Sequence, residues 1–514
     1  MVLNFDNQDP KLHRADELLP RKLQFLTADQ ITFSPIGVGM EKNDTGTYDP
    51  RNGYPHLNEL GAKWIRIQSG WFRAERQPGV YDFSWVDEGV DNIIAQGCIP
   101  WICLCYGNSL YDNSAVPGSR STSCPPIYTQ EARDAWQRFV KAFVAHYKGK
   151  VFHYEIWNEP DGKHCWKRGV DGGEYADLVK LTAPLIKAAH PDNKVIAGSM
   201  CNMVRLERFY EENDVGITFD DDPGVANFYR DWFNEETALL VDYITFHCYV
   251  PTPERKMVEL YRELQDRIDL LNPKVRIIMG ETGVHSDFAR TGALNSGEWN
   301  RESQVKYLLR RLMTDIANGA YFTSYFSLMD MCEDMEFAGE ARKKVKFGFY
   351  GVVGADFDEN DLSLGTYSRK PSYTALQCMA TAMAEGVDRE AETVRFCITP
   401  NVYWGTPDMD ENSFMGSRLT AYTLRRQGGD KMHIYYLASP LLGFTYDGST
   451  SLMLPQPMKN PAVLDLATGK FFRIPEEHIR TFDGKQTLLR LVLRDYPMAV
   501  VDLDDTTLPL IDEL

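Results

Sequence analysis

The feature that most constrains the fold of this chain is an alternation of short apolar runs and amphipathic segments along its first 385 residues. Runs of this length with few charges predict strands of a parallel sheet that is covered on both faces. The eight predicted strands are 36–40, 64–68, 99–105, 152–157, 195–199, 243–248, 276–280 and 321–327. The clearest predicted helices, recognised by apolar residues at helical spacing, are 85–96, 129–147, 174–190 and 302–318.

Eight strand–helix units predict an α/β protein with a closed (β/α)₈ TIM barrel, which takes about 250 residues and tolerates insertions. The alternative is an open, doubly wound sheet. Such a sheet commonly carries a glycine-rich, phosphate-binding turn after its first strand. The sequence IGVGMEKND that begins at Ile36 has no G-x-G-x-x-G pattern, so we favour the barrel.

The sequence pattern changes near residue 385. Short strands separated by glycine-containing turns are predicted at 432–437, 451–454, 462–466, 487–493 and 499–503. They predict an accessory β-sandwich domain over 386–514, after a barrel domain over 30–385. Residues 1–29 are too few to fold alone, and we expect them to add a strand to the sandwich or to brace the barrel.

Charge and composition exclude several classes of protein. The formal net charge is −18 and no run of five or more Lys or Arg occurs, so we expect no nucleic-acid partner, whereas a neutral sugar suits this surface. No apolar run reaches 18 residues, which predicts no membrane-spanning helix, and the first 22 residues lack the apolar stretch of a secretory signal. The ten cysteines form no C-x-x-C pair, so we expect reduced thiols in a cytoplasmic protein without a metal site or a cofactor.

Two glutamates follow predicted strands of the barrel. Glu159 stands in HYEIWNEP, where Pro160 forces the chain to leave the sheet. Glu281 follows the strand 276–280, with glycines on both sides of it that let the backbone turn and approach a ligand. Because the active sites of TIM barrels lie at the carboxyl ends of the strands, we expect both carboxylates at one rim.

A pair of carboxylates at one rim suits the cleavage of a glycosidic bond. One carboxyl group gives a proton to the departing oxygen, and the other, ionised, attacks the anomeric carbon. In enzymes that retain the anomeric configuration, the two groups lie about 5–5.5 Å apart. A separation of more than about 9 Å between Glu159 and Glu281 would exclude this chemistry.

These motifs resemble those of a known enzyme family. WNEP on the fourth strand together with GET on the seventh resembles clan A of the glycoside hydrolases. The stretch YGNSLY that begins at Tyr106, the EARDAW helix and HYEIWNEPDG are most similar to glycoside hydrolase family 39, over about residues 30–385. The resemblance implies that Glu159 is the acid/base and Glu281 the nucleophile.

The resemblance also implies roles for neighbouring residues. Arg66 would steady the nucleophile, and Asn158 would bind the 2-hydroxyl group of the sugar. His247 and Tyr249 stand two apart in FHCY and so share a face of their strand, and the tyrosine would donate to the nucleophile. On the eighth strand the chain departs from the family pattern, because FSLMD, beginning at Phe326, stands where many members have a tryptophan platform.

Two further features of the sequence bear on ligand binding. Trp71 and Trp166 stand near strand ends or in rim loops, where an aromatic ring could stack on a sugar. The acidic run DVGITFDDDPG at 214–224 lacks the regular oxygen spacing of a calcium loop, so we predict a solvated loop there.

The predicted function is that of a retaining glycoside hydrolase that cleaves β-glycosidic bonds of oligosaccharides by double displacement. The resemblance favours a β-D-xylosidase-like exo-glycosidase, while a β-glucosidase, an α-L-arabinosidase or an endo-glycanase would use the same machinery. A different class, a non-catalytic carbohydrate-binding barrel, is disfavoured because both glutamates are present. A homo-oligomer is left open, since accessory β-sandwiches often form interfaces.

Overall fold

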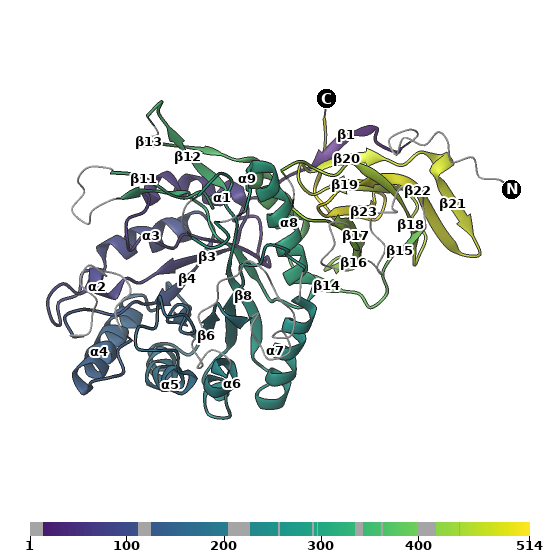
Figure 1. Ribbon diagram of the computed structural model, residues 1–514. Coiled ribbons are helices and arrows are strands. Elements are labelled where there is room, and N and C mark those ends of the chain that lie inside the picture. The colour runs from purple at the N-terminus through teal and green to yellow at the C-terminus, as the bar shows by residue number, and fades with distance from the viewer. Residues whose placement is uncertain are drawn as a thin grey trace.

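The computed structural model describes residues 14–111, 125–203, 227–254, 257–289, 292–295, 297–334, 343–360, 363–397, 418–441 and 443–513. Eight parallel strands in this part of the chain close into a barrel, in the order in which they follow one another in the sequence (Figure 1). They are β2 (Ile36–Gly39), β3 (Trp64–Gln68), β4 (Ile99–Leu104), β5 (His153–Ile156), β6 (Lys194–Met200), β7 (Tyr243–His247), β8 (Arg276–Thr282) and β9 (Thr323–Tyr325). Each lies within or overlaps one of the eight predicted runs, so the predicted barrel is confirmed.

Helices surround the barrel on its outer side (Figure 1). They are α1 (Tyr54–Leu60), α2 (Trp71–Ala74), α3 (Ser84–Ala95), α4 (Gln130–His146), α5 (Gly172–Ala189), α6 (Phe228–Trp232), α7 (Met257–Leu271), α8 (Arg301–Ala317) and α9 (Pro371–Ala382). The four helices predicted from the sequence are α3, α4, α5 and α8. Thr129 caps α4 as expected, because its side chain accepts a hydrogen bond from the backbone N–H of Ala132.

Large side chains fill the interior of the barrel at the end opposite the carboxyl ends of the strands. One buried cluster joins residues of five strands to the residue directly before β9 and contains no helix residue; its members are Trp64, Trp101, Ile196, Tyr243, Ile278 and Phe322. Side chains alternate along a strand, so Arg66 lies on the same inward face of β3 as Trp64. The guanidinium carbon of Arg66 lies 5.5 Å from the centroid of the Trp101 ring. The apolar cluster therefore forms a floor under the polar residues at the carboxyl end of the barrel.

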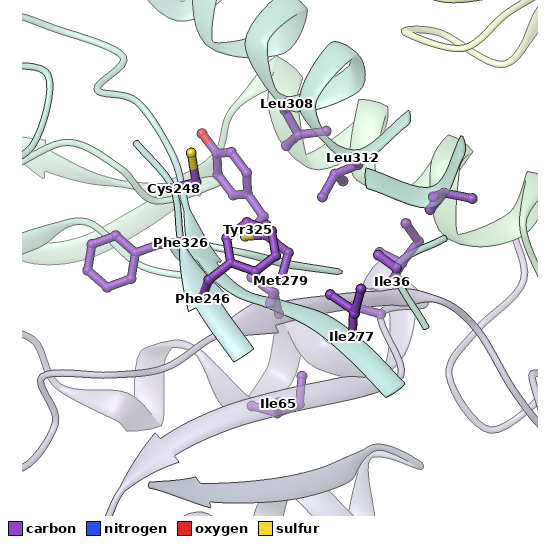
Figure 2. Packing of buried hydrophobic residues seen from close by; sticks show 14 of the residues in the cluster. Ile36, Ile65, Phe246, Cys248, Ile277, Met279, Leu308, Leu312, Tyr325 and Phe326 are labelled. Atoms are coloured by element: carbon purple, nitrogen blue, oxygen red, sulfur yellow. The ribbon is translucent and has the colours of Figure 1, made fainter. Parts of the chain in front are cut away.

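The outward faces of the strands pack against the helices. Figure 2 shows Ile277 and Met279 of β8 near Leu308 and Leu312 of α8, with Phe246 of β7 beside them. This packing explains why the strands read as nearly continuous apolar runs, since both faces of the sheet are covered.

Two antiparallel sheets form the C-terminal β domain. One has eight strands in the order β14 (Val387–Arg389), β16 (Arg418–Arg426), β17 (Lys431–Ala438), β23 (Met498–Asp502), β19 (Pro461–Asp465), β20 (Lys470–Arg473), β1 (Leu18–Leu23) and β24 (Leu510–Asp512). The other has four, in the order β15 (Arg395–Cys397), β18 (Gly448–Leu454), β22 (Lys485–Leu493) and β21 (Ile479–Phe482). The N-terminal β1 thus pairs with β20 and β24, far from it in sequence (Figure 1). The domain limits of 30–385 and 386–514 stay a prediction.

Helix α8 joins the barrel to the β domain. Its residues from Ser303 to Ala317 are all buried, although the sequence pattern predicted one polar face. Two of its buried polar residues contact the β domain. The Nζ atom of Lys306 lies 2.7 Å from Oδ2 of Asp495, and Nη1 of Arg310 donates to the carbonyl of Ser439 at 2.7 Å.

Two hairpins at the rim of the barrel were not predicted. They are β10 (Met331–Asp334) with β11 (Lys343–Gly348), and β12 (Val353–Phe357) with β13 (Ser363–Arg369). Asp330 and Lys370 flank this region and form a buried ion pair, with 2.7 Å between Oδ1 and Nζ. The pair holds the segment after β9 against the start of α9.

The eight cysteines that the structure describes in full are free, and all but Cys201 are buried, as expected for core thiols. Among the described residues, no helix combines the length and apolar character that crossing a bilayer requires. The acidic run 214–224 lies outside the described residues.

Candidate active site

The ends of four barrel strands bring the predicted residues together. Arg66 lies in β3, Glu159 follows β5, His247 ends β7, and Glu281 lies near the end of β8. Beyond β5 the backbone is strained: Trp157 and Glu159 adopt left-handed φ angles of 68° and 46°. Side chains with a Cβ rarely take this conformation, and it costs on the order of 1–3 kcal/mol where the surrounding structure imposes it.

The carboxylates of Glu159 and Glu281 face one another across the mouth of the barrel. One carboxylate oxygen of each glutamate and one ring nitrogen of His247 all lie within 4.8 Å of one another. The side chains of Glu159 and Glu281 are 12% and 13% exposed, so both reach the solvent at the mouth. This separation meets the requirement that the sequence analysis set, and it suits attack on an anomeric carbon placed between the two groups.

Both oxygens of Glu281 are held by donors. Nη1 of Arg66 donates to Oε2 at 2.8 Å, and the hydroxyl group of Tyr249 donates to Oε1 at 2.7 Å. Burial raises the pKa of Tyr249 well above its usual value, so the phenol keeps the proton that it donates. Such donors hold the carboxylate in one orientation, as a nucleophile requires.

Arg66 is completely buried and is itself oriented by Glu155. Nε and Nη2 of Arg66 donate to the two oxygens of Glu155, each at 2.8 Å, and Nη2 also donates to Oδ1 of Asn158 at 2.8 Å. Glu155 was not among the residues predicted to act in the site. Its sequence position did indicate a buried ion pair, because a charged residue inside a buried strand requires a buried partner of opposite charge.

Glu41, two residues after β2, is a second carboxylate that was not predicted to belong to the site. Its Oε1 atom lies 3.2 Å from Nη1 of Arg66, and its Oε2 atom is buried without a hydrogen-bond partner among the described residues. A Cβ atom at Gly39 would fall on this carboxylate, so a larger residue there would force the Glu41 side chain to move. Burial raises the pKa of Glu41 to about 8, and Arg66 opposes the rise only in part.

This pKa predicts a loss of stability between about pH 4.5 and pH 8. Within that window the folded protein keeps the proton of Glu41 while the unfolded chain releases it, so stability falls as the pH rises. In Glu41→Gln this titration is absent, and the amide oxygen can still accept from Arg66. We expect the variant to gain on the order of a few kcal/mol over the wild type between pH 5 and pH 8.

Chemical unfolding at pH 5 and at pH 8 measures this difference. Glu235→Gln, which removes an exposed carboxyl group, is the matched control and should show no such change with pH. A constant offset between Glu41→Gln and the wild type at both pH values would contradict the prediction.

Glu159 lies between two histidines. Nδ1 of His247 lies 3.0 Å from Oε1, and Nε2 of His164, whose side chain is 60% exposed, contacts Oε2. Burial opposes ionisation, but His164 and His247 outweigh it and hold the pKa of Glu159 well below its usual range. Glu159 raises the pKa of His164 to about 12 in return, so the pair holds one proton between them. The sequence analysis did not identify His164, which follows Glu159 in the same loop.

Two further residues border the carboxylates. Nδ2 of Asn158 lies 3.6 Å from Sγ of Cys165, and its Oδ1 atom is occupied by Arg66. Burial opposes the charge of Lys42, yet Asp44, Glu281 and Glu159 are among the groups that raise its pKa, which places its ammonium group near the site. Lys42 was also missed, since a lysine after a strand is usually solvated.

The glycines around Glu281 act by close packing. A Cβ atom at Gly280 would collide with Oγ1 of Thr245, and one at Gly283 would collide with the carbonyl oxygen of Phe326. Among the described residues, neither is found at positive φ, so the sharp turn expected from the sequence is not what requires them. They let β8 approach its two neighbouring strands.

Trp71 and Trp166 do not lie at the mouth. Trp71 is 1% exposed and stacks against Tyr111, with its Nε1 atom donating to Glu75. Trp166 is fully buried, and its Nε1 atom donates to Glu174 at 3.2 Å. Neither ring offers a free face to a sugar, which argues against the stacking role expected for both.

Aromatic side chains line the region after β9, where this chain lacks the tryptophan platform of the family pattern. The ring of Phe326 lies 5.1 Å from that of Tyr350 and 6.4 Å from that of Tyr249. Tyr350 follows β11 and was not considered in the sequence analysis. Burial raises the pKa of Tyr350 and the negative charge of Glu281 adds to the rise, so this ring borders the nucleophile.

The site therefore combines one carboxylate fixed by two donors with a second that shares a proton with a histidine. The first can attack a carbon atom, and the second can give or take a proton on the same bound molecule.

Comparison with known proteins finds one matching family and several structures of the same fold. The model of the family described as "Glycosyl hydrolases family 39" matches residues 53–412. A family 39 glycoside hydrolase from the gut symbiont Bacteroides cellulosilyticus WH2 has the same fold, with a TM-score of 0.60 at 16% identity; the match covers 93% of this chain and 83% of that chain.

Two other solved structures share the fold. A monomeric β-xylosidase from Caulobacter crescentus CB15 matches with a TM-score of 0.54 at 16% identity, covering 95% of this chain and 99% of that one. A GH30 endoxylanase from Clostridium papyrosolvens C71 matches with a TM-score of 0.52 at 12% identity, covering 94% and 98%. At these identities the likeness concerns the fold alone.

Proposed function

Because this chain belongs to the family 39 glycosyl hydrolases, we propose that it cleaves β-glycosidic bonds with retention of the anomeric configuration, by double displacement. Membership makes it an O-glycoside hydrolase. The observation that carries the retaining mechanism is the approach of the two carboxylates, with oxygens of Glu159 and Glu281 within 4.8 Å.

In the first step, an oxygen of Glu281 forms a bond to the anomeric carbon while the bond to the leaving oxygen breaks. The departing oxygen takes the proton that Glu159 and His164 hold between them, so the leaving group departs as an alcohol. Arg66 and Tyr249 keep the carboxylate of Glu281 aimed at the carbon. The products are the free alcohol and a glycosyl ester on Glu281.

In the second step, Glu159 takes a proton from a water molecule. The hydroxide attacks the anomeric carbon from the side that the leaving group vacated, and the bond to Glu281 breaks. Two displacements at one carbon restore its original configuration. The proton returns to the pair of Glu159 and His164, and the site is ready for another substrate.

The proposed substrate is a short oligosaccharide or glycoside with a terminal β-D-xylose. The similarity of fold to the Caulobacter crescentus β-xylosidase supports this choice together with the resemblance of the motifs. A β-glucosidase, an α-L-arabinosidase and an endo-glycanase remain the alternatives. The cytoplasmic location and a homo-oligomeric assembly also stay predictions.

A panel of 4-nitrophenyl glycosides tests the proposal. We expect turnover of the β-D-xyloside to exceed that of the β-D-glucoside and the α-L-arabinosides, and proton NMR should detect β-xylose before it equilibrates with the α anomer. Initial release of the α anomer would exclude double displacement. Faster turnover of another glycoside would move the substrate choice to that sugar.

A further inference from the structure

We propose that a divalent cation with affinity for thiolates, such as zinc, binds Glu159, His164 and Cys165 at the rim of the barrel. One carboxylate oxygen, one imidazole nitrogen and the Sγ atom of these residues all lie within 4.8 Å of one another. A thiolate, an imidazole and a carboxylate are the ligands from which zinc sites in proteins are built.

The three ligands belong to one short loop after β5, which is held by its own backbone. The N–H of Gly162 donates to the carbonyl of Glu159 at 3.1 Å, and the N–H of Cys165 donates to the carbonyl of Gly162 at 3.0 Å. These turns fold the loop so that residues six positions apart converge. Bonds from zinc to its ligand atoms are about 2.0–2.3 Å long. The three ligand atoms therefore need only a small movement toward one another to surround one cation.

The His164 side chain is able to make that movement. It is 60% exposed, while Cys165 is buried and is fixed by the contact of its Sγ atom with Nδ2 of Asn158. Two ligands would therefore stay in place while the imidazole swings onto the cation. Because His164 is exposed, a water molecule from the solvent would supply the fourth ligand, as in zinc sites with three protein ligands.

The consequence for the enzyme is inhibition, a conclusion that rests on the proposed role of Glu159. A carboxylate bound to a cation cannot receive the proton that the leaving group needs, and the imidazole that shares this proton is occupied as well. The binding site itself follows from the geometry alone and does not require that the enzyme is a xylosidase.

Binding of cobalt, the spectroscopic substitute for zinc, tests the site without any substrate. We expect one equivalent of Co²⁺ to produce a thiolate-to-cobalt charge-transfer band in the wild type, and Zn²⁺ to displace it. Cys165→Ser should abolish the band and weaken Zn²⁺ binding by at least about tenfold, measured by competition with a coloured chelator. His164→Asn should weaken binding but keep a thiolate band.

The matched control is Cys201→Ser. Cys201 is a neighbouring thiol, since a Cβ at Gly162 would meet its Sγ atom at 3.1 Å, but it is not part of the three-ligand cluster. This variant should keep the band and the zinc affinity of the wild type. A wild type without a thiolate band, or equal zinc affinity in Cys165→Ser and the wild type, would overturn the proposal, and so would loss of the band in Cys201→Ser.

Inhibition is measured separately, as the zinc concentration that halves turnover relative to the zinc-free activity of each variant. We expect this concentration to rise at least about tenfold in Cys165→Ser and to stay unchanged in Cys201→Ser. A cobalt band with no inhibition would refute the assigned role of Glu159 while leaving the metal site intact. Inhibition without a band would refute the metal site.

Discussion

Replacing Glu281 with glutamine is expected to lower kcat on an aryl β-xyloside by about 10⁴-fold or more, because the variant has no nucleophile to form the glycosyl ester. Arg66 keeps its two contacts with Glu155, so the variant should fold. The measurement is steady-state turnover, combined with the thermal unfolding midpoint to establish that the loss is chemical.

Glu281→Gly adds a sharper test of the same role. The space left by the carboxylate admits azide, which can attack the anomeric carbon in a single displacement. We expect azide to restore turnover with an activated aryl glycoside and to give the α-glycosyl azide, whose configuration is inverted. Glu235→Gln, the exposed control, should keep wild-type activity. Full activity of Glu281→Gln, or a β-glycosyl azide from the glycine variant, would exclude Glu281 as the nucleophile.

Much of the barrel was predictable because one physical cause acts at every strand. Each strand is covered on both faces, so each reads as an apolar run, and the run ends where the chain reaches the rim. The same logic placed Glu159 and Glu281 at one end of the barrel. The hairpin of β10 and β11 lies outside the barrel sheet, and its sequence carried no comparable signal.

The network around Arg66 could be predicted only in part. The resemblance paired Arg66 with Glu281, a contact that the structure contains at 2.8 Å. The contacts with Glu155 and Glu41 depend on which side chains of β2, β3 and β5 point inward at the same level. That level is set by the stagger of strands in the closed barrel, which a strand's own sequence does not reveal.

For the tryptophans, the sequence suggested a role in sugar binding that the structure argues against. Trp71 stands soon after a strand, and an aromatic residue near a rim is a reasonable candidate for sugar binding. In the structure its ring lies between α2 and α4, 5.5 Å from the ring of Phe139, and closes the core. Sequence position gives the distance of a residue from a strand end, but not the direction in which its side chain points.

Replacing Glu159 with alanine is expected to have an effect that depends on the leaving group. With xylobiose, whose leaving alcohol needs a proton, kcat/KM should fall by about 10²–10⁴-fold. With 2,4-dinitrophenyl β-xyloside, whose leaving group departs without a proton, kcat/KM should change little, while kcat falls because the glycosyl ester is hydrolysed slowly. Added azide should raise kcat and give the β-glycosyl azide, since it attacks the ester in the second displacement.

The same variant should also change the histidine that contacts Glu159. Glu159 raises the pKa of His164 to about 12, so its removal must lower that pKa, and the imidazole should titrate much nearer to neutrality. NMR of the His164 ring measures this change without substrate. An unchanged titration would mean that the two side chains do not share a proton. An equal loss of kcat/KM on xylobiose and on the dinitrophenyl glycoside would assign Glu159 to positioning the sugar rather than to proton transfer, because only proton transfer distinguishes the two leaving groups.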